Sequence, residues 1–158
     1  HLFGVTADEI EVLVHRQSIL HSAVELCDGA VIAQLGTPDM RLPIQYALTY
    51  PDRADNAFER LSLTDIGTLT FEKPDTETFK CLPLCIKAIN EGGLAPTAVN
   101  GANEEAVALF LQGKIKFLQI ADLVEKALAE VKNKRDFTLK DIFETDKAAR
   151  KLVRDSIF

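Results

Sequence analysis

The spacing of apolar residues changes along this chain of 158 residues, from short β-rich runs in the first third to helical spacing in the second half. Residues 10–14 form one β-rich run, and the runs 19–26 and 30–35 flank Asp28-Gly29. An Asp-Gly pair between two apolar runs is the strongest short-range signal of a β-hairpin. We therefore predict a strand over residues 10–14 and a hairpin over residues 19–35.

The Asp-Gly turn also predicts which residues face each other across the hairpin. If Asp28-Gly29 is a two-residue loop, counting outward along both strands brings His21 opposite Gly36. The open end of the hairpin then gathers His15–Ser18 and His21 beside the loop Gly36–Met40. The sequence therefore predicts one polar corner, in which segments that are separate in the sequence lie side by side.

Helical spacing governs most of the remaining chain. The clearest apolar stripe runs from Ile120 to Val131 and predicts one amphipathic helix. Asp39 is a suitable cap for a short helix that Pro51 ends, and Thr138 and Asp141 have the spacing of a capping box. The other predicted helices cover residues 79–90, a segment from near Asn100 to Gly113, and a last helix capped by Asp146.

These elements predict an α+β fold, in which a hairpin-containing sheet is followed by a helical bundle. The chain has room for one ordinary domain and a small companion. We assign residues 1–49 to the sheet-containing unit and residues 76–158 to the bundle. Residues 50–75 are polar and contain two prolines, so we predict a linker with at most one strand.

Composition and charge exclude several classes of protein. The content of 47% hydrophobic and 27% charged residues is typical of a folded globular domain. A net charge of -6 repels phosphate backbones, so we predict no nucleic-acid partner. The longest apolar run, Ala106–Leu111, is far shorter than the roughly 20 residues that cross a bilayer, so we predict no membrane span. Three cysteines without the spacing of a disulfide framework favour the reducing cytoplasm.

The first residues, His1-Leu2-Phe3-Gly4, lack an initiator methionine and the basic and apolar regions of a secretory signal. Apolar residues followed by glycine resemble the last turn of a helix. We therefore expect this chain to be a fragment of a longer polypeptide.

Few residues suggest chemistry when they are considered without a family. His15 and His21 flank Ser18 and are the only histidines besides His1. A histidine on a strand commonly hydrogen-bonds a backbone carbonyl, and no G-x-S-x-G turn surrounds Ser18. The two histidines also lack the i, i+4 spacing of helical zinc ligands. Structural roles are therefore favoured over nucleophilic or metal chemistry.

Other polar groups also have structural interpretations. Cys81 and Cys85 share one face of a predicted helix among apolar neighbours, which favours buried thiols over a metal site. Glu104-Glu105 is predicted to lie early in its helix, where acidic side chains complement the helix dipole. Gly92-Gly93 and Gly101 form no phosphate-binding loop, so we predict no nucleotide site.

A set of short segments, taken in order, resembles one enzyme family. These segments are Ile10–His15, Gln17–Ser22, Asp28-Gly29, Ala33–Gly36, Pro38–Ile44, Tyr50–Arg53 and Ala98–Glu104. Together they resemble 1-deoxy-D-xylulose 5-phosphate reductoisomerase, and the resemblance extends over essentially the whole chain. It implies that residues 1–49 belong to the C-terminal part of a catalytic domain and that residues 76–158 form a C-terminal helical domain.

The resemblance implies an enzyme of the non-mevalonate route to isoprenoids. The family rearranges the carbon skeleton of 1-deoxy-D-xylulose 5-phosphate and reduces the product with NADPH to 2-C-methyl-D-erythritol 4-phosphate. It uses Mg²⁺ or Mn²⁺ and usually forms homodimers. By this comparison the metal ligands and the NADPH-binding domain lie upstream of His1, so the fragment is expected to bind neither cofactor and to be inactive alone.

Within the chain, the resemblance implies a supporting wall of the site. Ser18 and His21 would border the pocket for the phosphorylated sugar, and Pro38 and Met40 would form apolar surface near the lid and the nicotinamide. It implies no catalytic residue and no metal ligand in this chain. His21 would either contact the substrate or orient another group. The alternative hypothesis is a stand-alone interaction or dimerisation module of the same fold.

Two residues depart from the family pattern. Arg16 stands where the family usually has proline, which frees the φ angle and adds a positive charge beside the predicted corner. Gly101 replaces a common alanine, a change that costs about 1 kcal/mol inside a helix and little at its cap.

Overall fold

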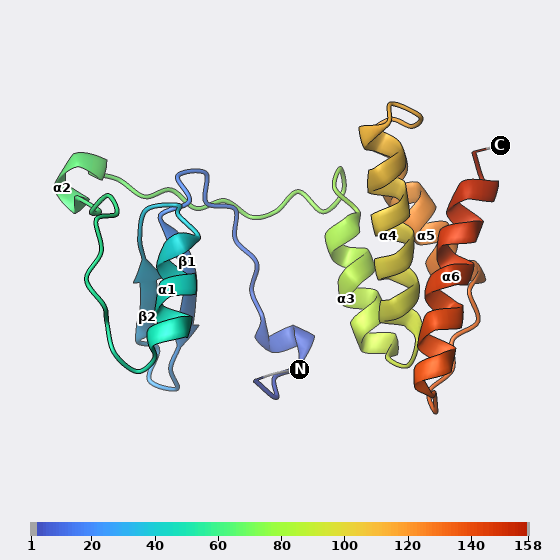
Figure 1. Ribbon diagram of the computed structural model, residues 1–158, viewed down its shortest axis with the longest axis horizontal. Helices are drawn as coiled ribbons and strands as arrows, with labels where there is room; N and C mark the ends of the chain where they lie inside the picture. The colour runs from blue at the N-terminus through green and yellow to red at the C-terminus, as the bar shows by residue number, and fades with distance from the viewer. Residues whose placement is uncertain (1–2, 158) are drawn as a thin grey trace. The chain divides into compact units, whose positions relative to one another are not determined.

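The computed structural model describes residues 3–157, which form two compact units (Figure 1). One unit comprises residues 12–73 and contains the hairpin. The other joins the described residues before position 12 to those from position 74 onward and is helical. The prediction of an α+β fold with a helical bundle is confirmed. The helix ending predicted at the start of the chain falls partly on His1 and Leu2, which lie outside the described residues.

The hairpin consists of β1 (Leu20–Glu25) and β2 (Val31–Leu35), which pair antiparallel. The predicted register is wrong by one residue, because the loop has three residues instead of two. The Leu26 N–H donates to the Ala30 carbonyl (2.8 Å), and Val31 lies opposite Glu25. Gly29 has a φ of 84° and the Asp28 carboxylate accepts the Ala30 N–H, a combination that closes a three-residue loop.

A second irregularity in the hairpin involves His21. Leu20 lies opposite Leu35 whereas Ser22 lies opposite Gln34, so His21 is an extra residue in β1, as in a β-bulge. The predicted pairing of His21 with Gly36 is therefore wrong. The Gly36 N–H instead donates to the Ile19 carbonyl (3.0 Å).

The predicted strand over residues 10–14 is also wrong. A short 3₁₀ helix, η1 (Ala7–Glu9), precedes this run. Only Val14 pairs, through two 2.9 Å hydrogen bonds with the backbone of Glu72. The apolar side chains of this run are largely exposed, and among residues 3–157 no second strand lies beside it. A β-rich run without a partner cannot form a ladder.

Helix α1 (Arg41–Thr49) follows the hairpin, and the prediction of a short helix ended by Pro51 is confirmed. The N-cap residue is Met40, so the prediction that Asp39 caps this helix is wrong, although the Asp39 carboxylate accepts the Arg41 N–H at 2.9 Å. The segment after α1, predicted as a linker, contains the short helix α2 (Leu63–Ile66). It belongs to the hairpin-containing unit and is hydrogen-bonded to α1, because the Gln45 amide donates to the Ala54 carbonyl (3.0 Å).

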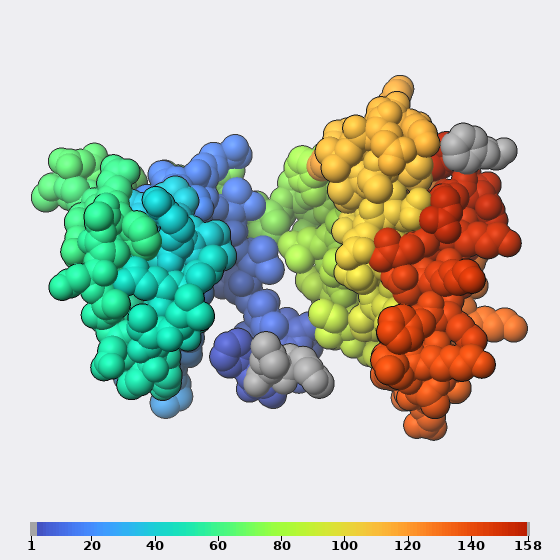
Figure 2. Space-filling view, in the orientation of Figure 1, coloured from blue at the N-terminus to red at the C-terminus, as the bar shows by residue number. Residues whose placement is uncertain are grey.

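Four helices form the second unit, and the predicted bundle is confirmed. They are α3 (Cys81–Glu91), α4 (Ala95–Leu111), α5 (Gln119–Glu130) and α6 (Leu139–Asp155). Helix α4 packs against both α5 and α6, and its contact with α6 is visible in the space-filling view (Figure 2). None of the helices in the described part of the chain is long and apolar enough to cross a membrane.

Two helix starts differ from the predictions. Helix α4 begins at Ala95 because Pro96 fits the first turn, where no backbone N–H is needed. Glu104-Glu105 consequently lies in the middle of α4, and both carboxylates pair with arginines of α6. Helix α6 begins at Leu139, after Thr138 with the predicted capping box, and continues past Asp146, which accepts from Arg150 and caps no separate helix.

The core of the helical unit is built from small and medium apolar side chains. Its buried members are Leu84, Ala88, Ala95, Val99, Ala102, Ala106, Leu109, Ile115, Ile120, Val124, Ala127, Ala149 and Val153. Six of these thirteen residues are alanines, so the helix backbones approach closely. In residues 12–73, by contrast, only Ile19 and Gly36 are buried.

Candidate functional site

The predicted site begins with a tight turn before β1. The Ser18 N–H donates to the His15 carbonyl (3.1 Å), and Ser18 has a φ of 53°, which is uncommon for a residue with a side chain. One nitrogen of the His21 ring bonds the Ser18 carbonyl (2.9 Å), and the other lies 3.2 Å from the amide oxygen of Gln34. The structure therefore brings Ser18 and His21 together, as the sequence predicts.

The loop after β2 approaches the same ring at Gly36. A Cβ atom at this buried glycine would lie 3.8 Å from His21 Cε1 and 3.4 Å from side-chain atoms of Gln34 and Leu42. A larger side chain would press on these neighbours. Gly36 therefore allows the loop to pass close to His21, although the two residues are not paired across the strands. Pro38 and Met40 follow in this loop, and both are exposed.

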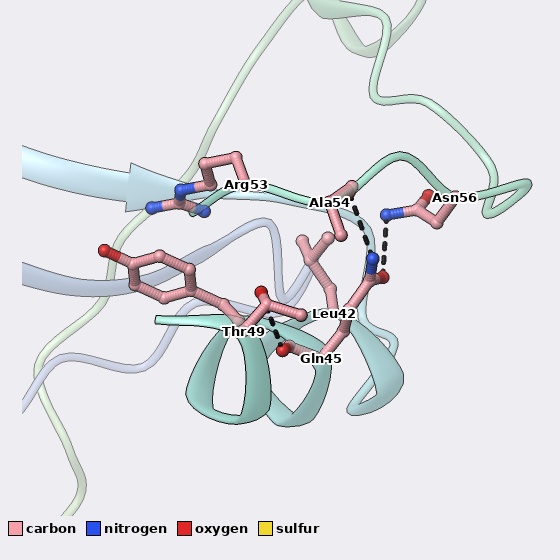
Figure 3. Close-up of a pocket in the computed structure, with 7 residues that line it drawn as sticks. Leu42, Gln45, Thr49, Arg53, Ala54 and Asn56 are labelled. Atoms are coloured by element: carbon pink, nitrogen blue, oxygen red, sulfur yellow. Dashed lines mark hydrogen bonds between the residues drawn. The ribbon is translucent and has the colours of Figure 1, made fainter. Parts of the chain in front are cut away.

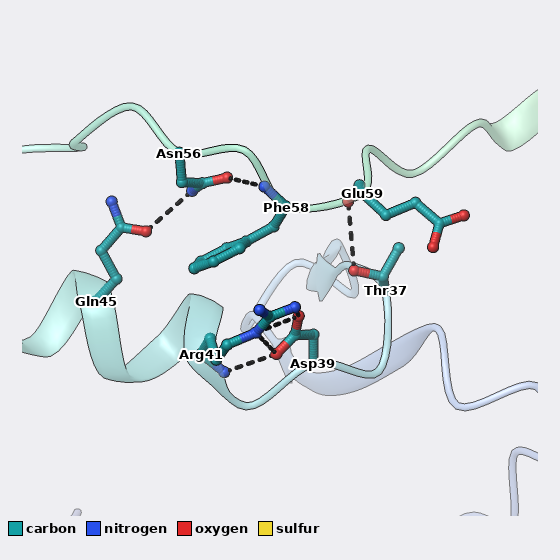
Figure 4. Close-up of polar contacts among 7 residues, drawn as sticks. All are labelled: Thr37, Asp39, Arg41, Gln45, Asn56, Phe58 and Glu59. Carbon is teal, nitrogen blue, oxygen red and sulfur yellow. Dashed lines mark hydrogen bonds and ion pairs between the residues drawn. The ribbon is translucent and has the colours of Figure 1, made fainter.

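Asp39 and Arg41 hold the loop at the start of α1 (Figure 4). The Arg41 guanidinium forms hydrogen bonds of 2.6 to 3.0 Å with the Asp39 carboxylate, which lower the pKa of that carboxyl below its ordinary value. The same guanidinium lies over the ring of Phe58, 4.5 Å from its centre. Asp39 and Phe58 thus hold Arg41 from two sides, and Arg41 in turn fixes the end of the loop with Pro38 and Met40.

No pattern in the sequence predicts the segment that covers this loop. The Thr37 hydroxyl lies 3.5 Å from the Glu59 carbonyl, and Asn56 joins the Phe58 N–H to the Gln45 side chain (Figure 4). These contacts link an irregular segment to α1 through side-chain amides. Asn and Gln are common in loops, so their types alone do not predict a partner.

A hollow beside α1 is too small for a substrate. Figure 3 shows it between Gln45, Thr49 and the segment Arg53–Asn56, with a volume of about 20 Å³. The Arg53 guanidinium lies 3.7 Å from the centre of the Tyr46 ring at its edge. This volume holds about one water molecule.

A larger apolar cavity of about 200 Å³ lies in the helical unit, lined by Phe79, Cys81, Val107 and Phe117 among others. Burial, and less strongly Cys85, raises the pKa of the Cys81 thiol. Cys81 is only half-buried and Cys85 is exposed, so the prediction of two buried thiols is wrong. This apolar lining does not suit a phosphorylated sugar.

The described residues offer no cluster for a divalent metal. Among residues 3–157, no group of three or more His, Cys, Asp or Glu side chains is arranged to hold an ion. The side chains near His21 are an amide, a hydroxyl and apolar groups, which are poor ligands for Mg²⁺.

Comparison with known families gives a match over most of the chain. Residues 35–152 match the family described as DXP reductoisomerase C-terminal domain. The 1-deoxy-D-xylulose 5-phosphate reductoisomerase of Acetivibrio thermocellus is 54% identical over 156 residues, which are 99% of this chain and 41% of that protein. The same enzyme from Clostridium botulinum strain Alaska E43 is 53% identical, over 98% of this chain and 40% of that protein.

Solved structures give the same result. The reductoisomerase of Zymomonas mobilis in complex with NADPH matches 99% of this chain and 42% of its own, with a TM-score of 0.92 and 43% identity. A DOX-P reductoisomerase in complex with NADPH, fosmidomycin and magnesium matches with a TM-score of 0.92 and 39% identity, over 99% of this chain and 41% of its own. The chain spans about two fifths of the relatives it matches.

Proposed function

The chain belongs to the family of the DXP reductoisomerase C-terminal domain, and we propose on this basis that it works as part of a complete reductoisomerase. That enzyme would convert 1-deoxy-D-xylulose 5-phosphate to 2-C-methyl-D-erythritol 4-phosphate with NADPH and a divalent metal, in isoprenoid biosynthesis. The observation that carries the proposal is the agreement of fold over 99% of the chain with a reductoisomerase bound to NADPH, fosmidomycin and magnesium.

The proposed role of this chain is to form one wall of the substrate pocket. Ser18 is exposed, and within residues 3–157 its hydrogen bonds involve its backbone N–H and carbonyl and not its hydroxyl, which is therefore available to a polar group of the sugar phosphate. The His21 ring, held by Ser18 and Gln34, would orient this corner or contact the substrate. Exposed Pro38 and Met40 would cover the nicotinamide and exclude water from it.

The groups that bind NADPH and the metal would lie in the part of the relatives that this chain does not span. The chain alone is therefore proposed to be inactive. Free cysteines at all three positions agree with a cytoplasmic enzyme. We also propose a homodimer, to be tested on the complete enzyme by analytical ultracentrifugation.

The test is the complete enzyme assayed by NADPH oxidation with 1-deoxy-D-xylulose 5-phosphate and Mg²⁺. We expect Ser18→Ala to lower kcat/KM by roughly tenfold, the effect of losing one hydrogen bond to a charged substrate. Met40→Ala should raise the KM for NADPH, because it removes exposed apolar surface from the proposed nicotinamide wall.

Matched controls separate these effects from general damage. Ser22→Ala removes an exposed serine from β1, the strand that follows the turn with Ser18, and Leu48→Ala removes an exposed apolar side chain from α1, the helix that follows Met40. Both controls should keep the parent kinetics. Equal losses in Ser18→Ala and Ser22→Ala would contradict the proposed wall, and an enzyme without turnover would contradict the proposed reaction.

A further inference from the structure

The turn from His15 to Ser18 has an arginine at the position where turns favour proline. In β-turns of types I and II the second residue needs a φ near the value that a proline ring fixes. Arg16 occupies this second position, and its N–H takes part in no hydrogen bond within residues 3–157. Because no proline ring fixes the φ angle at this position, the turn depends on other contacts to hold its conformation.

Those contacts come from Glu72, a residue 56 positions away. Arg16 Nε donates to Glu72 Oε1 (2.8 Å) and Arg16 Nη2 donates to Glu72 Oε2 (3.0 Å), so the guanidinium binds the carboxylate with two parallel bonds. The Glu72 backbone is itself fixed by its two hydrogen bonds with Val14. The ion pair thus ties the turn to a residue with a defined position.

Both neighbours of Arg16 are attached to the same segment. The His15 ring bonds the Thr70 carbonyl (2.8 Å) and stacks on Phe71, with the ring centres 4.8 Å apart. The Gln17 amide oxygen accepts the Thr70 hydroxyl (3.0 Å). Four consecutive residues before Ser18 are therefore held by residues 70–72.

We propose that Arg16 and Glu72 are a positioning pair for the substrate-facing residues Ser18 and His21, an inference that rests on the proposed function. Ser18 has a left-handed backbone directly after the turn, and its carbonyl holds the His21 ring. The conformation of the turn therefore decides where the Ser18 hydroxyl and the His21 imidazole point. Arg16 itself acts through these two residues.

Because Arg16 and Glu72 are exposed to solvent, the strength of their ion pair depends on salt. The side chains of Arg16 and Glu72 are 73% and 51% exposed, so dissolved salt screens their attraction. Positioning by this pair should therefore weaken as ionic strength rises. A proline at the same position would act through its ring and would not respond to salt.

The experiment uses the complete enzyme with Arg16→Ala, Glu72→Gln and Arg16→Pro. We expect both Arg16→Ala and Glu72→Gln to raise the KM for the sugar phosphate by about two- to fivefold, with kcat changed less than twofold. This difference from the parent should disappear at high salt. Arg16→Pro should restore the low KM and keep it when salt is added.

The matched control is Arg154→Ala, which removes another arginine–carboxylate pair, formed with Glu105 in the helical unit (2.7 Å), in which the Arg154 side chain is 47% exposed and that of Glu105 is 17% exposed. It should leave the KM unchanged. A KM that is the same in the parent and Arg16→Ala at low salt would overturn the proposal. An Arg154→Ala effect as large as that of Arg16→Ala would also overturn it.

A second measurement does not depend on turnover. Hydrogen exchange followed by mass spectrometry should show faster exchange in peptides covering residues 14–22 of Arg16→Ala, because the Ser18 N–H and its neighbours open more often. If the enzyme does not turn over but this exchange is faster, the proposed function fails while the turn is still held by the pair. Unchanged exchange would overturn the positioning role, whatever the activity.

Discussion

At Gly101, the backbone of α4 lies so close to α6 that a methyl group has no room. A Cβ atom built there would lie 2.8 Å from Asp146 Oδ1 and 3.2 Å from the Asp146 carbonyl oxygen. The Asp146 carboxylate is itself held by Arg150 (2.8 Å). The absence of a side chain at this position therefore permits the contact between two helices that form much of the core.

This close approach predicts the effect of Gly101→Ala. In a free helix alanine is more stable than glycine by roughly 0.5–1 kcal/mol. Here the added methyl group must displace α6 or turn Asp146, and we expect a net loss of about 1–3 kcal/mol in the free energy of unfolding. Urea denaturation of the parent and variant measures the difference.

A double variant provides the control for Gly101→Ala. Asp146→Ala removes the nearest side-chain oxygen but leaves the Asp146 carbonyl oxygen in place, so the loss caused by Gly101→Ala should become smaller and should not vanish. A Gly101→Ala variant more stable than the parent would show that the helices separate easily, and the argument from close packing would be wrong.

At the scale of elements, the capping box of α6 links the stability of this helix to pH. The Asp141 carboxylate accepts from the Thr138 N–H and hydroxyl, both at 2.7 Å, and from Lys134. These bonds, led by the backbone N–H of Thr138, hold the pKa of Asp141 well below its ordinary value of 3.8. A group with a lowered pKa in the folded state stabilises the fold above its unfolded pKa, and this contribution is lost as the pH falls.

Asp141→Asn should therefore lower the midpoint of thermal unfolding at pH 7 by a few degrees, since the cap loses its charge. As the pH falls below 3.8, the parent should lose the same contribution, so that the two melting curves approach each other. Calorimetry over this pH range measures the difference. A constant difference at all pH values would show that the charge of Asp141 does not stabilise the helix.

Helices were easier to predict than strands, because residues close together in the sequence signal a helix, whereas a strand needs a partner from elsewhere in the chain. The stripe from Ile120 to Val131 and the spacing of Thr138 and Asp141 are local, and the structure has a helix over the stripe and a capping box at Thr138, as the sequence predicts. A strand needs a partner that the local pattern does not reveal. The run 10–14 has β-rich residues but pairs only at Val14, and the hairpin register depended on one additional loop residue.

The candidate site shows the same limit at longer range. The approach of His21 to Ser18 and Gly36 could be predicted because one hairpin joins all three residues. The contacts of Arg41 with Phe58 and of Arg16 with Glu72 could not be predicted. Opposite charges and aromatic rings occur throughout the chain, and only the fold selects among their many pairings.

At the scale of the whole molecule, burial is concentrated in one of the two units. The helical unit contains the apolar cluster, whereas residues 12–73 bury only Ile19 and Gly36. On the hairpin, Val24, Val31 and Ile32 are each more than 60% exposed. An isolated two-stranded hairpin is marginally stable in water, so the hairpin-containing unit depends on cover that residues 12–73 do not provide.

This contrast predicts how the chain behaves alone. We expect backbone amides of α4 to exchange at least about a hundredfold more slowly than those of β1 and β2 in the isolated chain. In the complete enzyme, the hairpin amides should become protected, because the remaining part of the protein would cover the exposed apolar side chains.

Val124→Ala serves as the control in the isolated chain, since Val124 is among the largest fully buried side chains of the helical unit. It should weaken protection in α4 and α5 by about 1–3 kcal/mol and leave the hairpin unchanged. Equal protection of the hairpin and α4 in the isolated chain would mean that residues 12–73 are stable without further cover. The difference in burial between the units would then not determine their stability.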